Sequence, residues 1–178
     1  GNTCPPSCLY FYNNDEDAIQ DFVDAATCFE HSVARVSTRD KGRMEVCVST
    51  GRDTRFQSGQ IPWNATGQTA VELEAPSRSG MYHWAESLGI LDKRADEKVI
   101  PAEVFELCDD DLALLLGRLW SGDGFFANAT QAVPFYATSS EQLAKDVQHV
   151  LLRLGILSGV HEKTFKYRGG ERTGYTVH

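Results

Sequence analysis

The sequence repeats itself at an offset of 124 residues, and no other feature constrains the fold as strongly. Phe11-Tyr12 and Phe135-Tyr136 each end an apolar stretch that is followed by a short polar segment. At the same offset, apolar positions with helical spacing coincide in pairs: Ile19 with Leu143, Val23 with Val147 and Ala26 with Val150. Such periodicity is typical of the buried stripe of an amphipathic helix. We therefore expect two similar halves, each built around one such helix.

The two predicted helices have recognisable ends. The first is expected to begin at Asn14, to carry acidic residues in its first turn and to bury Ile19, Phe22, Val23 and Ala26. In the second, Ser139 and Gln142 have the spacing of a capping box and Gly155 provides a stop. Its apolar stripe comprises Leu143, Val147, Val150, Leu151 and Leu154.

Alternating sequence follows each helix and predicts a β-hairpin. Residues 31–37 and 43–49 flank Lys41-Gly42, and residues 163–167 and 172–177 flank Gly169-Gly170. Each half thus reads as an α+β unit whose antiparallel sheet has one face free of helices. We assign residues 1–78 to the first repeat plus an insertion loop that begins at residue 50, and residues 79–178 to a connector and the second repeat. Short helices are expected at 81–88 and 101–107.

Residues 112–122 are almost wholly apolar and predict a buried helix packed on both sides, with small residues at Gly117 and Ser121. Asp123 follows between two glycines. A helix C-terminus carries partial negative charge, so a carboxylate is unfavourable there unless a cation is bound. Asp123 and the Gly122 carbonyl are therefore candidate ligands for Mg²⁺, which prefers oxygen donors. An ordinary helix stop is the alternative.

The net charge of −8 is unevenly distributed. Acidic residues gather in the predicted helices, whereas basic residues concentrate in the predicted strands. A basic strand face can bind a polyanion while the acidic helices keep the protein in solution. A charged, merely solvated strand face explains the pattern equally well. The candidate DNA-binding residues are Arg35, Arg39, Lys41, Arg43, Lys163, Lys166, Arg168 and Arg172.

The segment LGRLWSGDG at 116–124 resembles the motif of the LAGLIDADG homing endonucleases, with Asp123 at the position of the acidic metal ligand. The resemblance extends over residues 93–105, 135–148 and 151–156. The sequence of these segments is similar to that of the endonuclease domains inside inteins of replication proteins, such as the replicative helicase and the DNA polymerase III α subunit. It is strong over residues 79–156 and weaker over 9–49. Arg118 departs from the motif, because a small residue is usual there.

The resemblance implies a specific fold and activity. Two pseudo-symmetric αββαββα-type lobes place saddle-shaped antiparallel sheets in the DNA major groove, and their motif helices pack side by side. Mg²⁺ or Mn²⁺ ions held by the acidic residues support hydrolysis of the phosphodiester bond. A basic residue from the sheet assists each site: Lys163 or Lys166 in the second half, and Arg35 or Lys41 in the first. We take Lys163 as the catalytic candidate. Implied partners are double-stranded DNA at the intein insertion site, a flanking splicing domain and the host replication protein.

The repeat also predicts where the second carboxylate belongs. Subtracting 124 from Asp123 leads to a position before Gly1, and no apolar helix ending in Asp-Gly occurs in residues 1–30. We therefore expect the first motif helix to be absent here, and this stretch by itself not to cut both strands. Two alternatives stay open: an inactive LAGLIDADG-like DNA-binding domain, serving as a regulator or persisting as a decayed insertion, and a protein-interaction domain without a nucleic-acid role.

Five cysteines scattered through a chain of this size favour reduced thiols in a soluble, cytoplasmic protein. No apolar run approaches membrane-spanning length. A zinc site formed by Cys4, Cys8, Cys28 and His31 is disfavoured, because two prolines stiffen the link between the first two cysteines.

Overall fold

The computed structural model describes residues 8–39, 42–50, 78–126, 133–167 and 169–178. It is a mixed α+β structure with two antiparallel sheets, which confirms the predicted fold class. The chain separates into two compact units, Gly1–Ser87 and Leu88–His178. The boundary between the two sequence repeats at residue 78 stays a prediction. Most of the expected insertion loop, together with Lys41, Arg168 and Cys4, lies outside the described residues.

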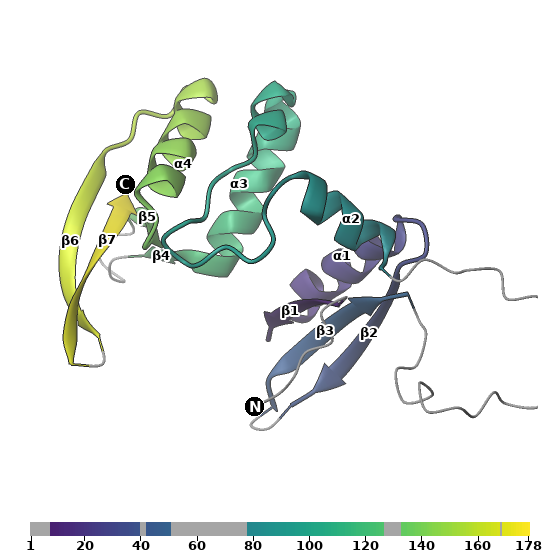
Figure 1. Ribbon diagram of the computed structural model, residues 1–178. Helices are drawn as coiled ribbons and strands as arrows, with labels where there is room; N and C mark the ends of the chain where they lie inside the picture. Colours follow the sequence, from purple (N-terminus) through teal and green to yellow (C-terminus); the bar gives the residue numbers. More distant parts are fainter. Residues whose placement is uncertain (1–7, 40–41, 51–77, 127–132, 168) are drawn as a thin grey trace, which may run out of the picture. The chain divides into compact units, whose positions relative to one another are not determined.

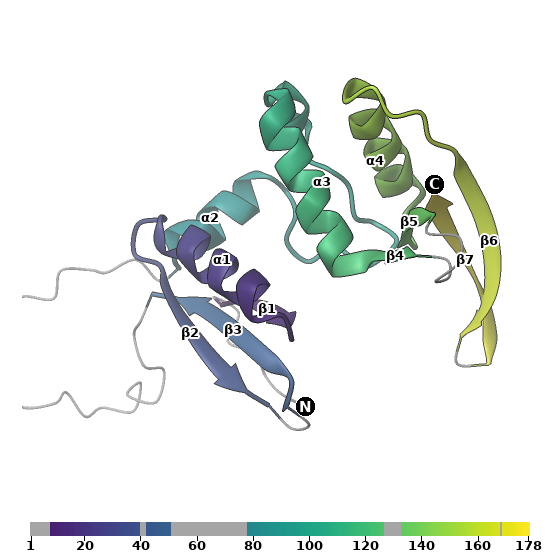
Figure 2. The same cartoon turned by 180° about the vertical axis from the view of Figure 1, so that it is seen from behind.

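The first unit contains β1 (Leu9–Asn13), α1 (Glu16–Thr27), β2 (Val33–Thr38), β3 (Met44–Ser49) and α2 (Gly80–Ser87). Its strands are antiparallel in the order β1-β3-β2. Helix α1 lies across one face of this sheet (Figure 2). The contact buries Ile19 and Ala26 of the helix against Val46 and Val48 of β3, as the apolar spacing predicted for the helix.

The second unit contains η3 (Ala102–Glu106), α3 (Asp109–Asp123), β4 (Gly124–Phe126), β5 (Pro134–Thr138), α4 (Glu141–Arg153), β6 (Val160–Tyr167) and β7 (Gly170–Val177). The antiparallel sheet has the order β4-β5-β7-β6. Helix α4 packs on it, and the β6–β7 hairpin extends past the end of that helix (Figure 1). The predicted stripe on α4 is buried, except that Leu154 is only half-buried.

The two sheets share one topology, because β1-β3-β2 corresponds to β5-β7-β6. The structural offset is 125 residues rather than 124. Asp15 caps α1 and Ser140 caps α4. The same offset relates Phe11 to Tyr136. Each of these side chains points into the core of its unit, on the same sheet face as its strand partner, Val46 or Val177. The expected match of Tyr12 with Tyr136 is wrong, because a shift of one residue in a strand moves a side chain to the opposite face.

The helix caps differ from the predictions by one residue each. Asp15, not Asn14, starts α1, and its Oδ1 accepts hydrogen bonds from the amides of Asp17 and Ala18. In α4 the cap is Ser140, whose Oγ accepts from the Leu143 amide at 3.1 Å. The predicted capping box is absent because Gln142 donates to Asp146 instead. Gly155 ends α4 as expected, with φ of 77° and the amides of Gly155 and Ile156 donating to the Leu152 and Leu151 carbonyls.

Two long-range hydrogen bonds fasten the segment before η3 onto α4. The Ser140 hydroxyl donates to the Lys98 carbonyl at 2.6 Å, and the Ile100 amide donates to the buried Asp146 carboxylate at 2.9 Å. These contacts fix the path of the chain that leads into α3. Among the described residues, none of the helices has the length and apolar character needed to cross a membrane.

Helix α3 starts earlier than predicted, because Asp109, Asp110 and Asp111 form its first turn. Within the second unit the helix is packed on one side, so packing on both sides stays a prediction. Leu112 and Leu116 are buried against the second-unit core, whereas Leu114 is 58% exposed. Within this unit, the apolar composition all round the helix therefore does not correspond to burial all round it.

Candidate nucleic-acid interface and metal ligand

Asp123 is the last residue of α3, and the next residue already begins β4. This abrupt change of direction depends on Gly124. A Cβ atom at that position would lie 2.5 Å from both the Trp120 carbonyl oxygen and the Trp120 ring. Those distances are below any normal contact, so only glycine allows the chain to pass so close to the tryptophan. Gly124 thereby fixes where the Asp123 carboxylate emerges.

Aromatic side chains pack close to the end of α3 that carries Asp123. Tyr136 of β5 is 2% exposed, and its ring centroid lies 5.5 Å from that of Trp120. Burial and the negative charge of Asp123 raise the pKa of Tyr136 to about 12. Asp123 itself is exposed. The helix end therefore presents a carboxylate to solvent beside a rigid, neutral phenol.

The oxygen donors at this helix end suit a hard divalent cation. The last carbonyls of a helix have no intrahelical partner, so the Gly122 carbonyl adds an oxygen beside the carboxylate. Among the described residues, however, no group of three or more His, Cys, Asp or Glu side chains is close enough together to hold a metal ion. Asp123 and Gly122 thus fit a metal ion as part of a ligand set, and the remaining ligands have to come from elsewhere.

The face of sheet β4-β5-β7-β6 opposite α4 carries two of the eight candidate DNA-binding residues, Lys163 and Arg172. Alternation along the strands places Val160, Tyr175 and Val177 toward the helix, where they pack on the core. The register then places the other set on the opposite face, which we call the open face. Its members are Phe125, Phe135, Ala137, His161, Lys163, Phe165, Arg172, Gly174, Thr176 and the adjoining His178.

Charge is partitioned between the two faces of this sheet. No Asp or Glu occupies a described strand position on the open face, whereas Glu162 and Glu171 fall on the helix side. Two pKa shifts reflect the difference. Burial and then Glu141 and Glu162 raise the pKa of Tyr175 on the helix side. On the open face, burial, His161 and the positive charge of Lys163 lower the pKa of His178.

The predicted basic residues of the β6–β7 hairpin therefore divide. Lys163 and Arg172 point to the open face. Lys166 points to the other face, directly opposite Glu171 in the neighbouring strand. The hairpin itself was correctly predicted, and Gly169 at its turn has φ of 81°.

Asp123 and Lys163 are not brought together. Asp123 immediately precedes β4, while Lys163 lies in β6, and these two strands form opposite edges of the sheet. Three strand spacings of about 4.8 Å separate them by about 14 Å, beyond the reach of a lysine side chain. The catalytic assignment of Lys163 stays a prediction, and its position is that of a contact separate from Asp123.

In the first unit the predicted basic residues have different surroundings. Arg35 is exposed on the face of sheet β1-β3-β2 opposite α1. Arg39 forms a two-point ion pair with Glu45, with Nε–Oε2 and Nη2–Oε1 distances of 2.6 and 2.9 Å. Arg43 lines a small hollow with Tyr12, Asn13 and Asn14. Arg39 is thus largely neutralised, whereas Arg35 and Arg43 remain candidate contacts.

Sequence reasoning missed the Glu45 side of this pair. Glu45 is 5% exposed, although it lies on the face away from α1. Burial by itself raises the pKa of Glu45, but hydrogen bonds from Arg39 and Tyr12 outweigh burial, and the pKa lies below its ordinary value. The alternation of β3 identifies the face of Glu45, but the partner in the turn region is only visible in three dimensions.

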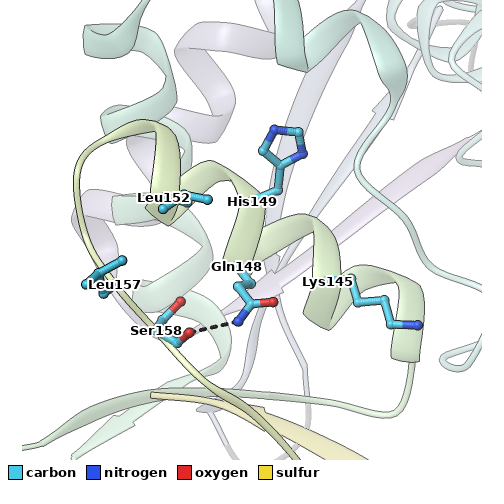
Figure 3. Close-up of a pocket in the computed structure, with 6 residues that line it drawn as sticks. All are labelled: Lys145, Gln148, His149, Leu152, Leu157 and Ser158. Atoms are coloured by element: carbon cyan, nitrogen blue, oxygen red, sulfur yellow. Dashed lines mark hydrogen bonds between the residues drawn. The ribbon is translucent and has the colours of Figure 1, made fainter.

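A separate hollow lies on the outer side of α4 and the segment that follows it (Figure 3). Gln148 donates a hydrogen bond to the Ser158 carbonyl at its edge, at 2.7 Å. The other lining residues are Lys145, His149, Leu152 and Leu157. Three of these belong to the exposed side of α4, so the hollow is not part of the open face.

Comparison with known proteins identifies a family model that matches the C-terminal part of the chain. Residues 110–178 match the model of the LAGLIDADG-like domain. The chain is 46% identical over 98 residues to the replicative DNA helicase DnaB of Synechocystis sp., and 38% identical over 102 residues to that of Rhodothermus marinus. It is 35% identical over 97 residues to the protein RecA of Mycobacterium bovis. These matches cover 53%, 54% and 52% of the chain, but only 11%, 11% and 12% of the relatives.

The fold is also that of a solved structure. The crystal structure of I-DmoI in complex with DNA and Mn superposes with a TM-score of 0.52 and 13% sequence identity, covering 96% of this chain and 72% of that one. A mesophilic variant of the homing endonuclease I-DmoI gives a TM-score of 0.51. Residues 110–178 are therefore a LAGLIDADG-like domain, in a chain that has the fold of the homing endonuclease I-DmoI.

Proposed function

We propose that the chain is the DNA-recognition body of an intein-borne homing endonuclease, which binds double-stranded DNA at the intein insertion site. The observation that carries the proposal is the charge partition of sheet β4-β5-β7-β6. Its open face carries Lys163 and Arg172 and no carboxylate at a described strand position. A surface of this kind attracts phosphates even though the whole chain has a net charge of −8.

Antiparallel strands are suited to this task. The major groove admits a two-stranded ribbon, and polar side chains on the strands can reach the base edges. Lys163 and Arg172 then contact phosphates, as do Arg35 on the first sheet and Arg43 immediately before β3. The likeness in fold to I-DmoI, a protein solved in complex with DNA and Mn, supports this assignment.

We assign the divalent cation, Mg²⁺ or Mn²⁺, to the α3 terminus. The Asp123 carboxylate and the Gly122 carbonyl are the protein ligands, and further ligands come from outside the described residues. When bound there, such an ion activates water and neutralises charge on the phosphate. Tyr136 and Trp120 support the carboxylate and keep the helix end in place. Lys163 holds a phosphate at a distance from this centre.

The relatives suggest where such a domain resides. Similarity to limited parts of the DnaB helicases and RecA supports insertion into a replication or recombination protein. A flanking splicing domain and the host protein are then the physical partners of the chain.

A binding experiment tests the proposal. Double-stranded DNA affinity should fall steeply with salt, and the slope of log K against log salt should decrease by about one for each phosphate contact removed. Lys163→Ala and Arg172→Ala should each weaken binding in this way. Lys166→Ala is the matched control, because it removes the same charge from the opposite face of the same hairpin. Equal effects of Lys163→Ala and Lys166→Ala, or no salt-dependent binding, would contradict the proposal.

Cleavage is tested on a plasmid that carries the intein-less host gene. With Mg²⁺ or Mn²⁺, the full-length protein should nick or cut the plasmid, and Asp123→Asn should abolish this while DNA binding persists. An Asp111→Asn variant controls for loss of a carboxylate at the other end of α3.

One observation favours a second candidate, an inactive DNA-binding relative. The described residues contain no cluster of metal-binding side chains around Asp123. This candidate predicts salt-dependent DNA binding without metal-dependent cleavage, whichever upstream residues are present.

A further inference from the structure

Four aromatic rings form a row across the open face of sheet β4-β5-β7-β6, one from each strand or its immediate end. The centroids of Phe125 and Phe135 are 5.6 Å apart, and those of Phe135 and His178 are 5.8 Å apart. His161 meets His178 edge to face at 5.0 Å. The row follows the strand order β4, β5, β7, β6, so it runs across the strands rather than along one of them.

The backbone and a hydroxyl hold the row in place. The His161 ring lies over Gly159, where an added Cβ atom would be 3.1 Å from Nε2. His178 Nε2 is 3.1 Å from the Thr176 hydroxyl, and the amides of Gly159 and His178 each donate to the other's carbonyl. The end of the row at β4 is open, because Phe125 is 56% exposed. A ligand can therefore contact Phe125 without rearrangement of the sheet.

The aromatic row borders on the positively charged side chains of Lys163 and Arg172. Burial, His161 and Lys163 lower the pKa of His178, which disfavours the charged form of that imidazole. Lys163 and Arg172 lie on the same face, two and four residue pairs further along the hairpin from His161. The open face thus combines an aromatic strip with a cationic region beyond it.

We propose that Phe125 and Phe135 read thymine methyl groups in the major groove, so that A·T pairs are specified at the β4–β5 end of the open face. Apolar side chains recognise thymine in this way, because its methyl group is the one apolar feature on the groove edge of a base pair. The proposal rests on the proposed function, since it requires that this face binds DNA. It adds which residues determine sequence preference and which base they prefer.

The test compares two short duplexes in fluorescence anisotropy: an alternating adenine–thymine duplex and the same duplex with deoxyuridine in place of thymidine. The two differ only by the methyl groups. The chain should bind the thymine duplex about fourfold more tightly for each methyl group that it buries. In Phe125→Ala this preference should fall by about fourfold, the contribution of one methyl contact, with binding of the deoxyuridine duplex nearly unchanged.

Leu152→Ala is the matched control, because Leu152 is also 56% exposed but belongs to α4. It should retain the preference. Lys163→Ala should weaken binding of both duplexes by the same factor. Thermal unfolding of each variant reports on its fold, and exposed Phe125 can be removed without opening the core.

The outcomes separate the two proposals. No salt-dependent binding to either duplex would remove the proposed function itself. Salt-dependent binding that is equal for the two duplexes, or a methyl preference that is undiminished in Phe125→Ala, would leave the proposed function standing and overturn the assignment of Phe125. Tighter binding to the single strand than to the duplex would also overturn it, because unpaired bases would then be stacking on the rings.

Discussion

The glycines of the motif segment are alike in sequence but different in structure. An added Cβ at Gly124 would overlap the Trp120 carbonyl and ring, whereas at Gly117 and Gly122 it would meet nothing within 4 Å. Gly124 is therefore needed for the passage of the chain from α3 into β4, and it determines where Asp123 is presented. The sequence indicates the glycine pair around Asp123 but not which member is sterically required.

This difference gives a prediction at the level of single residues. Gly124→Ala should destabilise the protein by about 1–3 kcal/mol, because the new methyl group has to displace backbone or a packed ring. Gly117→Ala, in the interior of the same helix and facing open space, should stabilise it by about 0.5–1 kcal/mol. Urea unfolding measures both. Similar destabilisation by the two variants would show that the close approach at Gly124 is not the cause.

Among the elements, the helices were easier to predict than their ends. The stripes of α1 and α4 follow directly from apolar spacing of about 3.6 residues. Most of their residues are buried as expected, whereas Phe22, Val23 and Leu154 are only half-buried. The caps shifted by one residue, because several neighbouring side chains are able to cap and the tertiary structure selects among them. Ser140 prevails over Ser139 because its hydroxyl also reaches the Lys98 carbonyl, 42 residues away.

Strand faces depend on the same one-residue differences. The observed offset of 125 places Phe11 and Tyr136 in equivalent core positions and leaves Tyr12 on the outer face beside Glu45. Alternation separates Lys163 from Lys166, but only the pairing with β7 identifies which of them shares a face with Arg172 and which faces Glu171. Helix periodicity tolerates a shift of one residue better than strand periodicity does.

The sheet β1-β3-β2 carries a pH prediction through Glu45. Hydrogen bonds from Arg39 and Tyr12 outweigh the effect of burial, so the pKa of Glu45 in the folded chain lies below its ordinary value of 4.5. Ionisation of Glu45 therefore stabilises the fold above pH 4.5, and this contribution is lost as the pH falls through the lower, folded-state pKa.

Thermal unfolding between neutral and acidic pH checks this prediction. The loss of stability on acidification should be smaller in Glu45→Gln than in the unchanged chain. Glu103→Gln, which removes an exposed carboxyl group of η3, should leave the pH dependence as it was. If Glu45→Gln and the unchanged chain lost the same stability on acidification, the ionisation of Glu45 would not contribute to the acid sensitivity of the fold.

Across the whole molecule, the net charge of −8 conceals a local arrangement. Acidic side chains lie in the first turns of α1 and α3, where helix dipoles favour them, and on the helix side of the second sheet. The described strand positions of the open face carry none. Composition alone would therefore give the wrong sign for the surface that we propose to meet DNA.

Screening makes this arrangement testable. The Debye length is about 8 Å at physiological ionic strength, which is comparable to the thickness of a sheet with its side chains. Glu141→Gln and Glu162→Gln, on the helix side, should thus change DNA affinity by less than about twofold at physiological salt. They should strengthen binding at low salt, where the field reaches further. Anisotropy titrations at both ionic strengths test this prediction. A large effect of either substitution at physiological salt would instead place the two carboxylates beside the DNA.

The sequence by itself determined the local structure and the chemistry of the motif. The periodicities of α1 and α4, the turns at Gly42 and Gly169, and the carboxylate at the end of an apolar helix all arise from neighbouring residues, so they can be inferred without coordinates. The tertiary structure decided which cations share a face, that Arg39 is paired with Glu45, that Lys163 is a sheet's width from Asp123, and that four rings from four strands form one row. These relations depend on strand order, register and the geometry of turns, which sequence patterns specify only weakly.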